Sequence, residues 1–130
     1  MPYSKEVMDH FANPRNMGEI SDPDGVGKKG NPGDGDMVYI YIKVKNDILT
    51  EVKFKAFGCA AAIATSSVLT ELAKGRTLEE AARITRQDVA DALGGLPQQK
   101  IECSAIGPDA LREAIDDYLR KRGRESIKIN

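Results

Sequence analysis

The sequence predicts an α+β sandwich, in which a small antiparallel β-sheet is covered by helices. Residues 37–45 and 48–57 each alternate apolar and polar side chains, which is typical of strands with one buried face. Asn46-Asp47 between them predicts a β-hairpin turn. A hairpin is not stable alone, so the helical patterns that follow must cover its apolar face. The residues expected to face the helices are Ile40, Ile42 and Val44 in the first strand and Val52, Phe54 and Ala56 in the second.

A helix and a long loop are expected before the hairpin. Apolar residues have helical spacing within residues 3–12, and Asn13-Pro14 ends this helix. Residues 18–35 are rich in glycine and proline, so we expect no regular element there. The segment is interpreted either as a flexible arm or as a functional loop that becomes ordered when metal or a partner binds.

Four helices are expected after the hairpin. Residues 60–74 are rich in alanine and stop at Gly75. Thr77 and Thr85 each stand three positions before an acidic residue, the capping pattern that begins a short helix. The last helix is expected to begin near Pro108, because proline suits a first helical turn. Its apolar stripe consists of Leu111, Ala114, Ile115, Tyr118 and Leu119.

Size and composition fit one globular domain over residues 1–130, with 41% apolar and 30% charged residues. The net charge of −1 provides no strong field for nucleic acid or an anionic membrane, so we expect neither as a partner. The basic residues at 120–124 are interpreted as a solvated helix end. The N-terminus has no apolar core of a signal peptide, and two cysteines without an export signal predict free thiols in the cytoplasm.

The two cysteines are the first candidates for chemistry. Cys59 lies where the second strand ends and the alanine-rich helix begins, and the positive helix end there favours a thiolate that binds metal or receives sulfur. A buried cysteine that acts as a small hydrophobe is an equally good interpretation. Cys103 follows 44 residues later, just before the expected last helix, so the pair forms neither a CxxC motif nor a closely spaced zinc knuckle.

Three carboxylates and one histidine lie in positions that could support these cysteines. Asp34 and Asp36 occupy a glycine-rich loop, where carboxylates are most simply turn residues. Glu102 precedes Cys103 and is either a ligand or a solvent-facing side chain. His10 is the only histidine and is expected on the surface of the first helix, so no hydrolase-type triad is indicated.

Four motifs in the same order and nearly the same spacing give the chain a specific resemblance, over about residues 3–120. They are residues 9–16 (DHFANPRN), 57–67 (FGCAAAIATSS), 96–100 (LPQQK) and 100–104 (KIECS). Together they resemble the U-type iron–sulfur cluster scaffolds, the family of IscU and the N-terminal domain of NifU. Such scaffolds assemble a [2Fe–2S] cluster, receive sulfur as a persulfide from a cysteine desulfurase and pass the cluster to apo-proteins.

The resemblance also implies roles for residues at matching positions. Cys59 and Cys103 match the second and third cluster cysteines, Asp36 matches the aspartate, and Cys103 stands at the sulfur-acceptor position. Residues Leu96, Pro97 and Lys100 match a segment recognised by an Hsp70-type chaperone, although Gln98-Gln99 replace its commoner Pro-Val. In this interpretation the chain is not an enzyme, because the sulfur chemistry belongs to the desulfurase.

Two positions depart from the family pattern. Asp34 stands where the family has its first cysteine, and Glu102 stands where it has a histidine. Both replacements keep a metal-ligating side chain but exchange a soft or borderline donor for hard oxygen, so a cluster held here is expected to be labile. Two alternatives remain open: a mononuclear Zn²⁺ or Fe²⁺ site made by the same residues, and a metal-free partner or regulator of the desulfurase.

Overall fold

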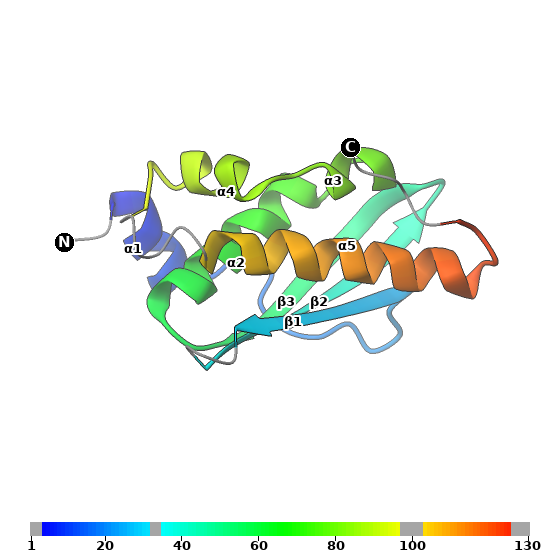
Figure 1. The fold of residues 1–130 in the computed structure, drawn as a ribbon, viewed down its shortest axis with the longest axis horizontal. Coiled ribbons are helices and arrows are strands. Elements are labelled where there is room, and N and C mark those ends of the chain that lie inside the picture. The colour runs from blue at the N-terminus through cyan, green and yellow to red at the C-terminus, as the bar shows by residue number, and fades with distance from the viewer. Residues whose placement is uncertain (1–3, 32–34, 97–102, 126–130) are drawn as a thin grey trace.

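The computed structural model describes residues 4–31, 35–96 and 103–125. Figure 1 shows the elements in chain order, with a sheet on one side of the molecule and helices α2 and α5 packed across it. The α+β prediction is therefore confirmed. The elements are α1 (Lys5–Ala12), β1 (Gly25–Asn31), β2 (Asp36–Lys45), β3 (Ile48–Phe57), α2 (Ala60–Ala73), α3 (Leu78–Ala82), α4 (Arg86–Ala92) and α5 (Cys103–Lys121).

The sheet has three antiparallel strands in the order β1-β2-β3. The predicted hairpin joins β2 to β3, and Asn46 and Asp47 have φ values of 54° and 59°, as a two-residue type I′ turn requires. A bulge between Lys43 and Val44 shifts the pairing by one residue, so that Met37 lies opposite Phe57 at the far end.

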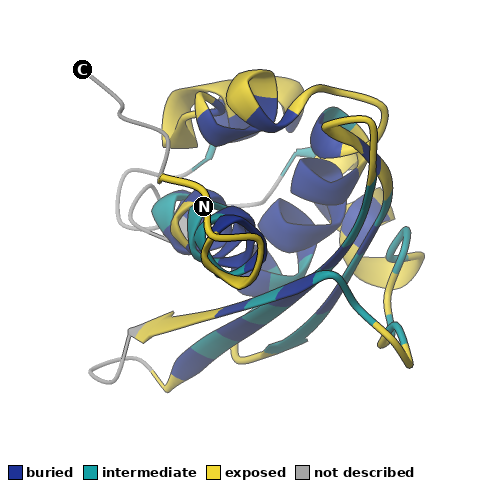
Figure 2. Cartoon of the chain, turned by 90° about the vertical axis from the view of Figure 1, so that its right-hand side faces the viewer, coloured by how far each residue is buried: buried dark blue, intermediate teal, exposed yellow. Residues whose placement is uncertain are grey.

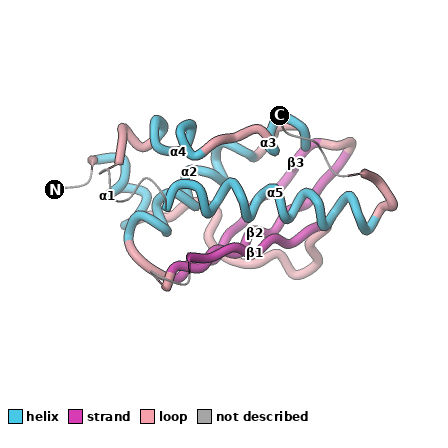
Figure 3. Tube along the Cα trace, in the orientation of Figure 1, coloured by secondary structure: helices cyan, strands magenta, loops and turns pink. Residues whose placement is uncertain are grey.

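The core lies between the sheet and the helices. Figure 2 shows the buried residues gathered on the facing surfaces of these two layers, and Figure 3 shows the strands beneath α2 and α5. Both predicted strand faces and the apolar stripe of the last helix contribute to this core. No helix in the described part of the chain is long and apolar enough to span a bilayer. The largest fully buried side chains include Ile40, Ile42, Phe54, Leu69, Leu93, Leu111, Ile115 and Leu119.

Both predicted capping boxes are present. The Thr77 hydroxyl accepts a hydrogen bond from the Glu80 N–H, and the Glu80 carboxylate accepts one from the Thr77 N–H. Thr85 and Asp88 form the same reciprocal pair at the start of α4. The four orphan N–H groups at each helix start favour this arrangement, which is why the local sequence was sufficient to predict it.

The expectation of no regular element over residues 18–35 was wrong, because residues 25–31 form β1. Glycine hides this strand from a pattern search, since it carries no side chain that could alternate. A Cβ at Gly27 would lie 1.9 Å from the Ala110 carbonyl oxygen, and one at Gly25 would lie 2.3 Å from that of Ala114. Glycine at alternate positions thus allows α5 to lie directly on β1.

The edge of β1 is covered by the same helix. The backbone N–H of Val26 donates to the Asp117 carboxylate at 2.9 Å, and that of Lys28 donates to Glu113 at 3.3 Å. These bonds satisfy edge donors that would otherwise be open to another strand. The segment interpreted as a flexible arm or a functional loop is, over residues 25–31, an integral strand of the sheet.

The predicted start of the last helix was also wrong: α5 begins at Cys103, five residues before Pro108. Gly107, next to this proline, lies against α2, where an added Cβ would be 2.8 Å from Leu69 Cδ2. Packing of the first turns on α2 therefore outweighs the local preference for a start at proline. As a consequence, Cys103 is the first residue of the helix and does not precede it.

His10 is buried rather than exposed, which corrects the expectation of a surface residue. The residue is 8% exposed, and its Nδ1 lies 2.7 Å from the Ser67 hydroxyl of α2. The same hydroxyl accepts the Arg15 N–H at 2.8 Å, which leaves its own hydrogen available to Nδ1. The other ring nitrogen, Nε2, lies 3.6 Å from a Glu71 carboxylate oxygen, a position that suits the tautomer with its proton on Nε2. Burial and the nearby Arg15 lower the pKa of His10, against a smaller opposite effect of Glu71.

This environment predicts a pH-dependent stability. The folded state holds His10 neutral, whereas the unfolded chain protonates it below about pH 6.5. The free energy of unfolding should therefore keep its full value above that pH and decline as the pH falls toward the lowered pKa. Urea titrations of the parent and His10→Asn at pH 7.5, 6.5 and 5.5 measure the effect, because asparagine keeps an acceptor but does not titrate. Equal pH dependence in the two proteins would contradict this role of His10.

Candidate metal and cluster site

Cys59 occupies the strand-to-helix junction predicted from the sequence. Strand β3 ends at Phe57, Gly58 turns the chain, and Cys59 is the N-cap residue of α2. Its side chain makes no capping hydrogen bond and is partly exposed. The thiol is therefore accessible at the positive end of a 14-residue helix.

Asp36 caps the helix start in place of the Cys59 side chain. This aspartate is the first residue of β2 and only 2% exposed. Its Oδ1 accepts the Cys59 N–H at 3.1 Å, and its Oδ2 lies 3.9 Å from the Cys59 Sγ. The carboxylate thus caps α2 from a neighbouring strand and contacts the thiol at the same time. The register of the hairpin explains the contact between Asp36 and Cys59. Met37 pairs with Phe57, so the next position outward from the turn places Asp36 opposite Gly58.

The distance between the two donor atoms suits a shared metal ion. A tetrahedral ion bound to sulfur at about 2.3 Å and to a carboxylate oxygen at about 2.1 Å separates those atoms by about 3.6 Å. Cys59 Sγ and Asp36 Oδ2 are 3.9 Å apart without any ion between them. Two of the predicted ligands are therefore close to the separation that one iron or zinc would impose.

The start of α5 lies at the same end of the molecule. Gly25 contacts Ala114 and Tyr118, and Gly27 contacts Ala110, so α5 runs antiparallel to β1. From Gly27 to Asn31 the strand advances about 13 Å, and from Ala110 to Cys103 the helix retreats about 10 Å. The start of α5 therefore lies toward the same end of the sheet as Asn31, which pairs with Asp36. Figure 1 shows the N-terminal ends of α2 and α5 at this one end.

The remaining predicted site residues fall largely outside the described residues. These are Asp34, Pro97, Lys100, Glu102 and the side chain of Cys103. Leu96 is described and packs, half-buried, against the core. Within the described part of the chain, no group of three or more His, Cys, Asp and Glu side chains is close enough to hold a metal. Cys59 and Asp36 thus form the described half of the predicted site.

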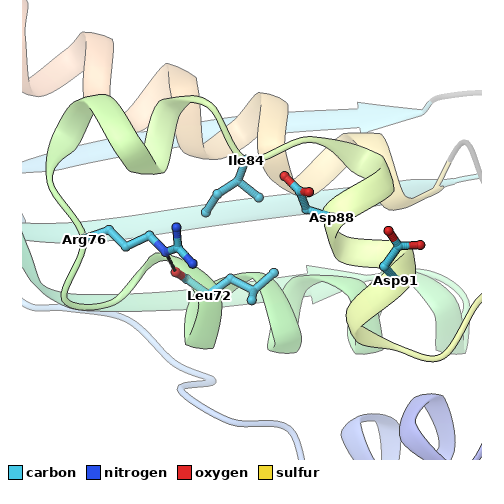
Figure 4. Close-up of a pocket in the computed structure, with 5 residues that line it drawn as sticks. All are labelled: Leu72, Arg76, Ile84, Asp88 and Asp91. Atoms are coloured by element: carbon cyan, nitrogen blue, oxygen red, sulfur yellow. Dashed lines mark hydrogen bonds between the residues drawn. The ribbon is translucent and has the colours of Figure 1, made fainter.

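A cavity of about 290 Å³, lined by residues of α2, of α4 and of the segments next to them, is separate from this pair (Figure 4). Leu72 and Ile84 contribute apolar side chains to its lining, and Arg76, Asp88 and Asp91 contribute charged ones. Leu72 is 13 residues along α2 from Cys59, or about 20 Å. The cavity offers no sulfur or imidazole donor, so we do not assign it to the cluster site.

The sequence matches a known protein family. Residues 2–125 match the family model of the NifU-like N terminal domain. The chain belongs to this family. The match covers nearly all of the sequence, and the resemblance inferred from the four motifs is confirmed.

Individual relatives of this NifU-like domain agree with the assignment. The iron-sulfur cluster assembly scaffold protein IscU 1 of Archaeoglobus fulgidus is 62% identical over 122 residues, which cover 94% of this chain and 80% of the relative. The scaffold protein IscU of Aquifex aeolicus is 50% identical, with coverage of 98% and 83%. The crystal structure of a NifU-like protein (N-terminal) from Brucella abortus has the same fold, with a TM-score of 0.72 at 21% identity and coverage of 90% and 94%.

Proposed function

We propose that this NifU-like domain is a scaffold on which an iron–sulfur cluster is assembled and then passed to apo-proteins. The observation that supports the proposal most directly is the Cys59–Asp36 pair, a thiol and a buried carboxylate 3.9 Å apart at one helix start. The chain acts as one domain and catalyses no reaction of its own. The cluster is its cargo, and the cytoplasm is the compartment in which free thiols would serve this purpose.

The ligand set proposed for a [2Fe–2S] cluster combines both halves of the site. Cys59 and Asp36 come from the described half, and Cys103, the first residue of α5, is the proposed third protein ligand. Asp34 lies two residues before Asp36, and Glu102 lies directly before Cys103, so each of these carboxylates is close in sequence to another proposed ligand. Oxygen donors hold soft iron–sulfur units less firmly than thiolates, and a labile cluster suits a protein that must release it.

A single Zn²⁺ or Fe²⁺ is the second candidate cargo, because the Sγ–Oδ2 separation also fits one tetrahedral ion. A metal-free partner of the desulfurase is the third possibility. Anaerobic incubation with iron and sulfide, followed by visible absorption and analysis of bound iron, zinc and sulfide, distinguishes the three. A scaffold binds iron and sulfide in equal amounts with charge-transfer absorption. Metal without sulfide would indicate the mononuclear site. A protein that binds no metal and no sulfide would overturn both metal functions.

The proposed partners follow from the same site. A cysteine desulfurase supplies sulfur, and apo-proteins receive the cluster. An Hsp70-type chaperone is proposed to bind the segment that contains Leu96, Pro97 and Lys100. Leu96 is half-buried against the core, so a chaperone that takes up this side chain must draw it away from the core.

Asp34 provides a test of the altered ligand set. Asp34→Cys replaces a hard oxygen donor by a thiolate, so the reconstituted cluster should persist several-fold longer in air. Asp34→Ala removes a donor and should shorten cluster lifetime or reduce bound iron. Both are measured by the decay of visible absorption after anaerobic reconstitution. If Asp34→Ala retains its cluster as long as the parent does, Asp34 is a turn residue only.

A further inference from the structure

The geometry points to Gly58 as a positioning residue of the proposed metal site. Gly58 stands between β3 and the N-cap residue Cys59 and has a φ of +136°. A Cβ built on it would lie 1.9 Å from Asp36 Oδ1 and 2.9 Å from Asp36 Cγ. The space that the missing side chain leaves is therefore the space that the Asp36 carboxylate occupies.

Such an overlap cannot be relieved by a small adjustment. Real Cβ atoms essentially never approach another heavy atom within 3.0 Å, so the carboxylate must move when residue 58 has a side chain. Asp36 is 2% exposed, and its Oδ1 accepts the Cys59 N–H. Displacement of the carboxylate breaks this bond and separates Oδ2 from the Cys59 Sγ, which lie 3.9 Å apart in the parent.

The expected change in metal affinity rests on the proposed function. The positioning of Asp36 by Gly58 does not depend on any metal. Gly58 has no side chain that could bind metal. It acts through Asp36, which in turn holds the backbone of Cys59. Residues that orient metal ligands in this way typically change metal affinity by about 10- to 100-fold when they are mutated.

Backbone strain is a competing explanation for any effect of Gly58→Ala, and the chain offers a matched control. Gly18 has nearly the same backbone angle, with a φ of +133°, but a Cβ added there would find nothing within 4 Å. Gly18→Ala therefore introduces similar strain without touching Asp36. A difference between the two variants isolates the contact with the carboxylate.

The test measures Co²⁺ affinity, by sulfur-to-cobalt charge-transfer absorption, in the parent, Gly58→Ala, Gly18→Ala, Asp36→Ala and the double variant Gly58→Ala/Asp36→Ala. We expect at least tenfold weaker binding for Gly58→Ala and a change below twofold for Gly18→Ala. The double variant should bind no more weakly than Asp36→Ala, because the two residues act as a unit. Additive losses, or equal losses in both glycine variants, would overturn the inference.

Amide hydrogen exchange of Cys59, measured by NMR without metal, provides the second readout. Its N–H donates to Asp36 in the parent, so exchange should accelerate at least tenfold in Gly58→Ala and in Asp36→Ala. The amides of Ala62 and Ile63 donate to the Cys59 carbonyl and should stay protected, which shows that α2 remains folded. Unchanged Cys59 exchange in Gly58→Ala would refute the positioning role. If the parent binds no Co²⁺ but the exchange result holds, the proposed function fails and the positioning role stands.

Discussion

Gly27→Ala is expected to lower the free energy of unfolding by about 3 kcal/mol, the upper range for overpacking a core. The added methyl group would lie 1.9 Å from the Ala110 carbonyl oxygen and 2.6 Å from the Ala114 nitrogen. Both atoms belong to helix backbone, so α5 as a whole must move away from β1. Urea denaturation followed by circular dichroism measures the loss.

Lys29→Ala is the control for Gly27→Ala on the same strand. The Lys29 ammonium lies 3.2 Å from Glu113, but both side chains are substantially exposed, and such surface pairs contribute little. Its free energy of unfolding should remain within about 0.5 kcal/mol of the parent. An equally small effect of Gly27→Ala would contradict the close packing of α5 on β1.

Cys103→Ser is expected to abolish acceptance of sulfur from a cysteine desulfurase, whereas Cys59→Ser should retain part of it. In the proposed step the Cys103 thiolate attacks the outer sulfur of the desulfurase persulfide, the sulfur–sulfur bond breaks, and the desulfurase thiolate leaves. The Cys103 backbone begins α5, where helix N–H groups favour a thiolate.

Peptide mass spectrometry after incubation with desulfurase and cysteine locates the transferred sulfur. The parent and Cys59→Ser should carry one extra sulfur atom on the peptide that contains Cys103. Extra sulfur on Cys59 alone would contradict the assignment. Circular dichroism of both serine variants shows whether each is folded, so a loss of transfer can be attributed to the missing thiol.

The fold was predictable wherever local sequence and tertiary packing favour the same structure. The turn at Asn46-Asp47 and the caps at Thr77 and Thr85 are local devices, and all three are present. Strand β1 was missed because its glycines do not form an alternating pattern. They are required by the close packing of a helix that lies more than 80 residues away in the sequence. His10 was misplaced for a related reason, since its partner Ser67 is 57 residues distant.

The candidate site was predictable in part from local signals. A cysteine at a strand-to-helix junction can be inferred from sequence, and Cys59 is there. The contact with Asp36 depends on hairpin register over ten residues, and pairing outward from the turn at Asn46-Asp47 would have placed Asp36 opposite residue 57 or 58. The bulge near Lys43 decides between these two, and it has no evident sequence signal. Gly58 carries no sequence signal of its own, because its role appears only once the Asp36 carboxylate is seen beside it.

Cluster transfer tests the scaffold function most directly. The reconstituted protein is desalted anaerobically and mixed with an apo-ferredoxin that takes a [2Fe–2S] cluster, and the circular dichroism of the holo-ferredoxin is followed over time. The scaffold function predicts that holo-ferredoxin forms faster than from equal amounts of free iron and sulfide, as the scaffold's own absorption disappears. Formation no faster than from the free ions, or a cluster that stays on the donor, would contradict it.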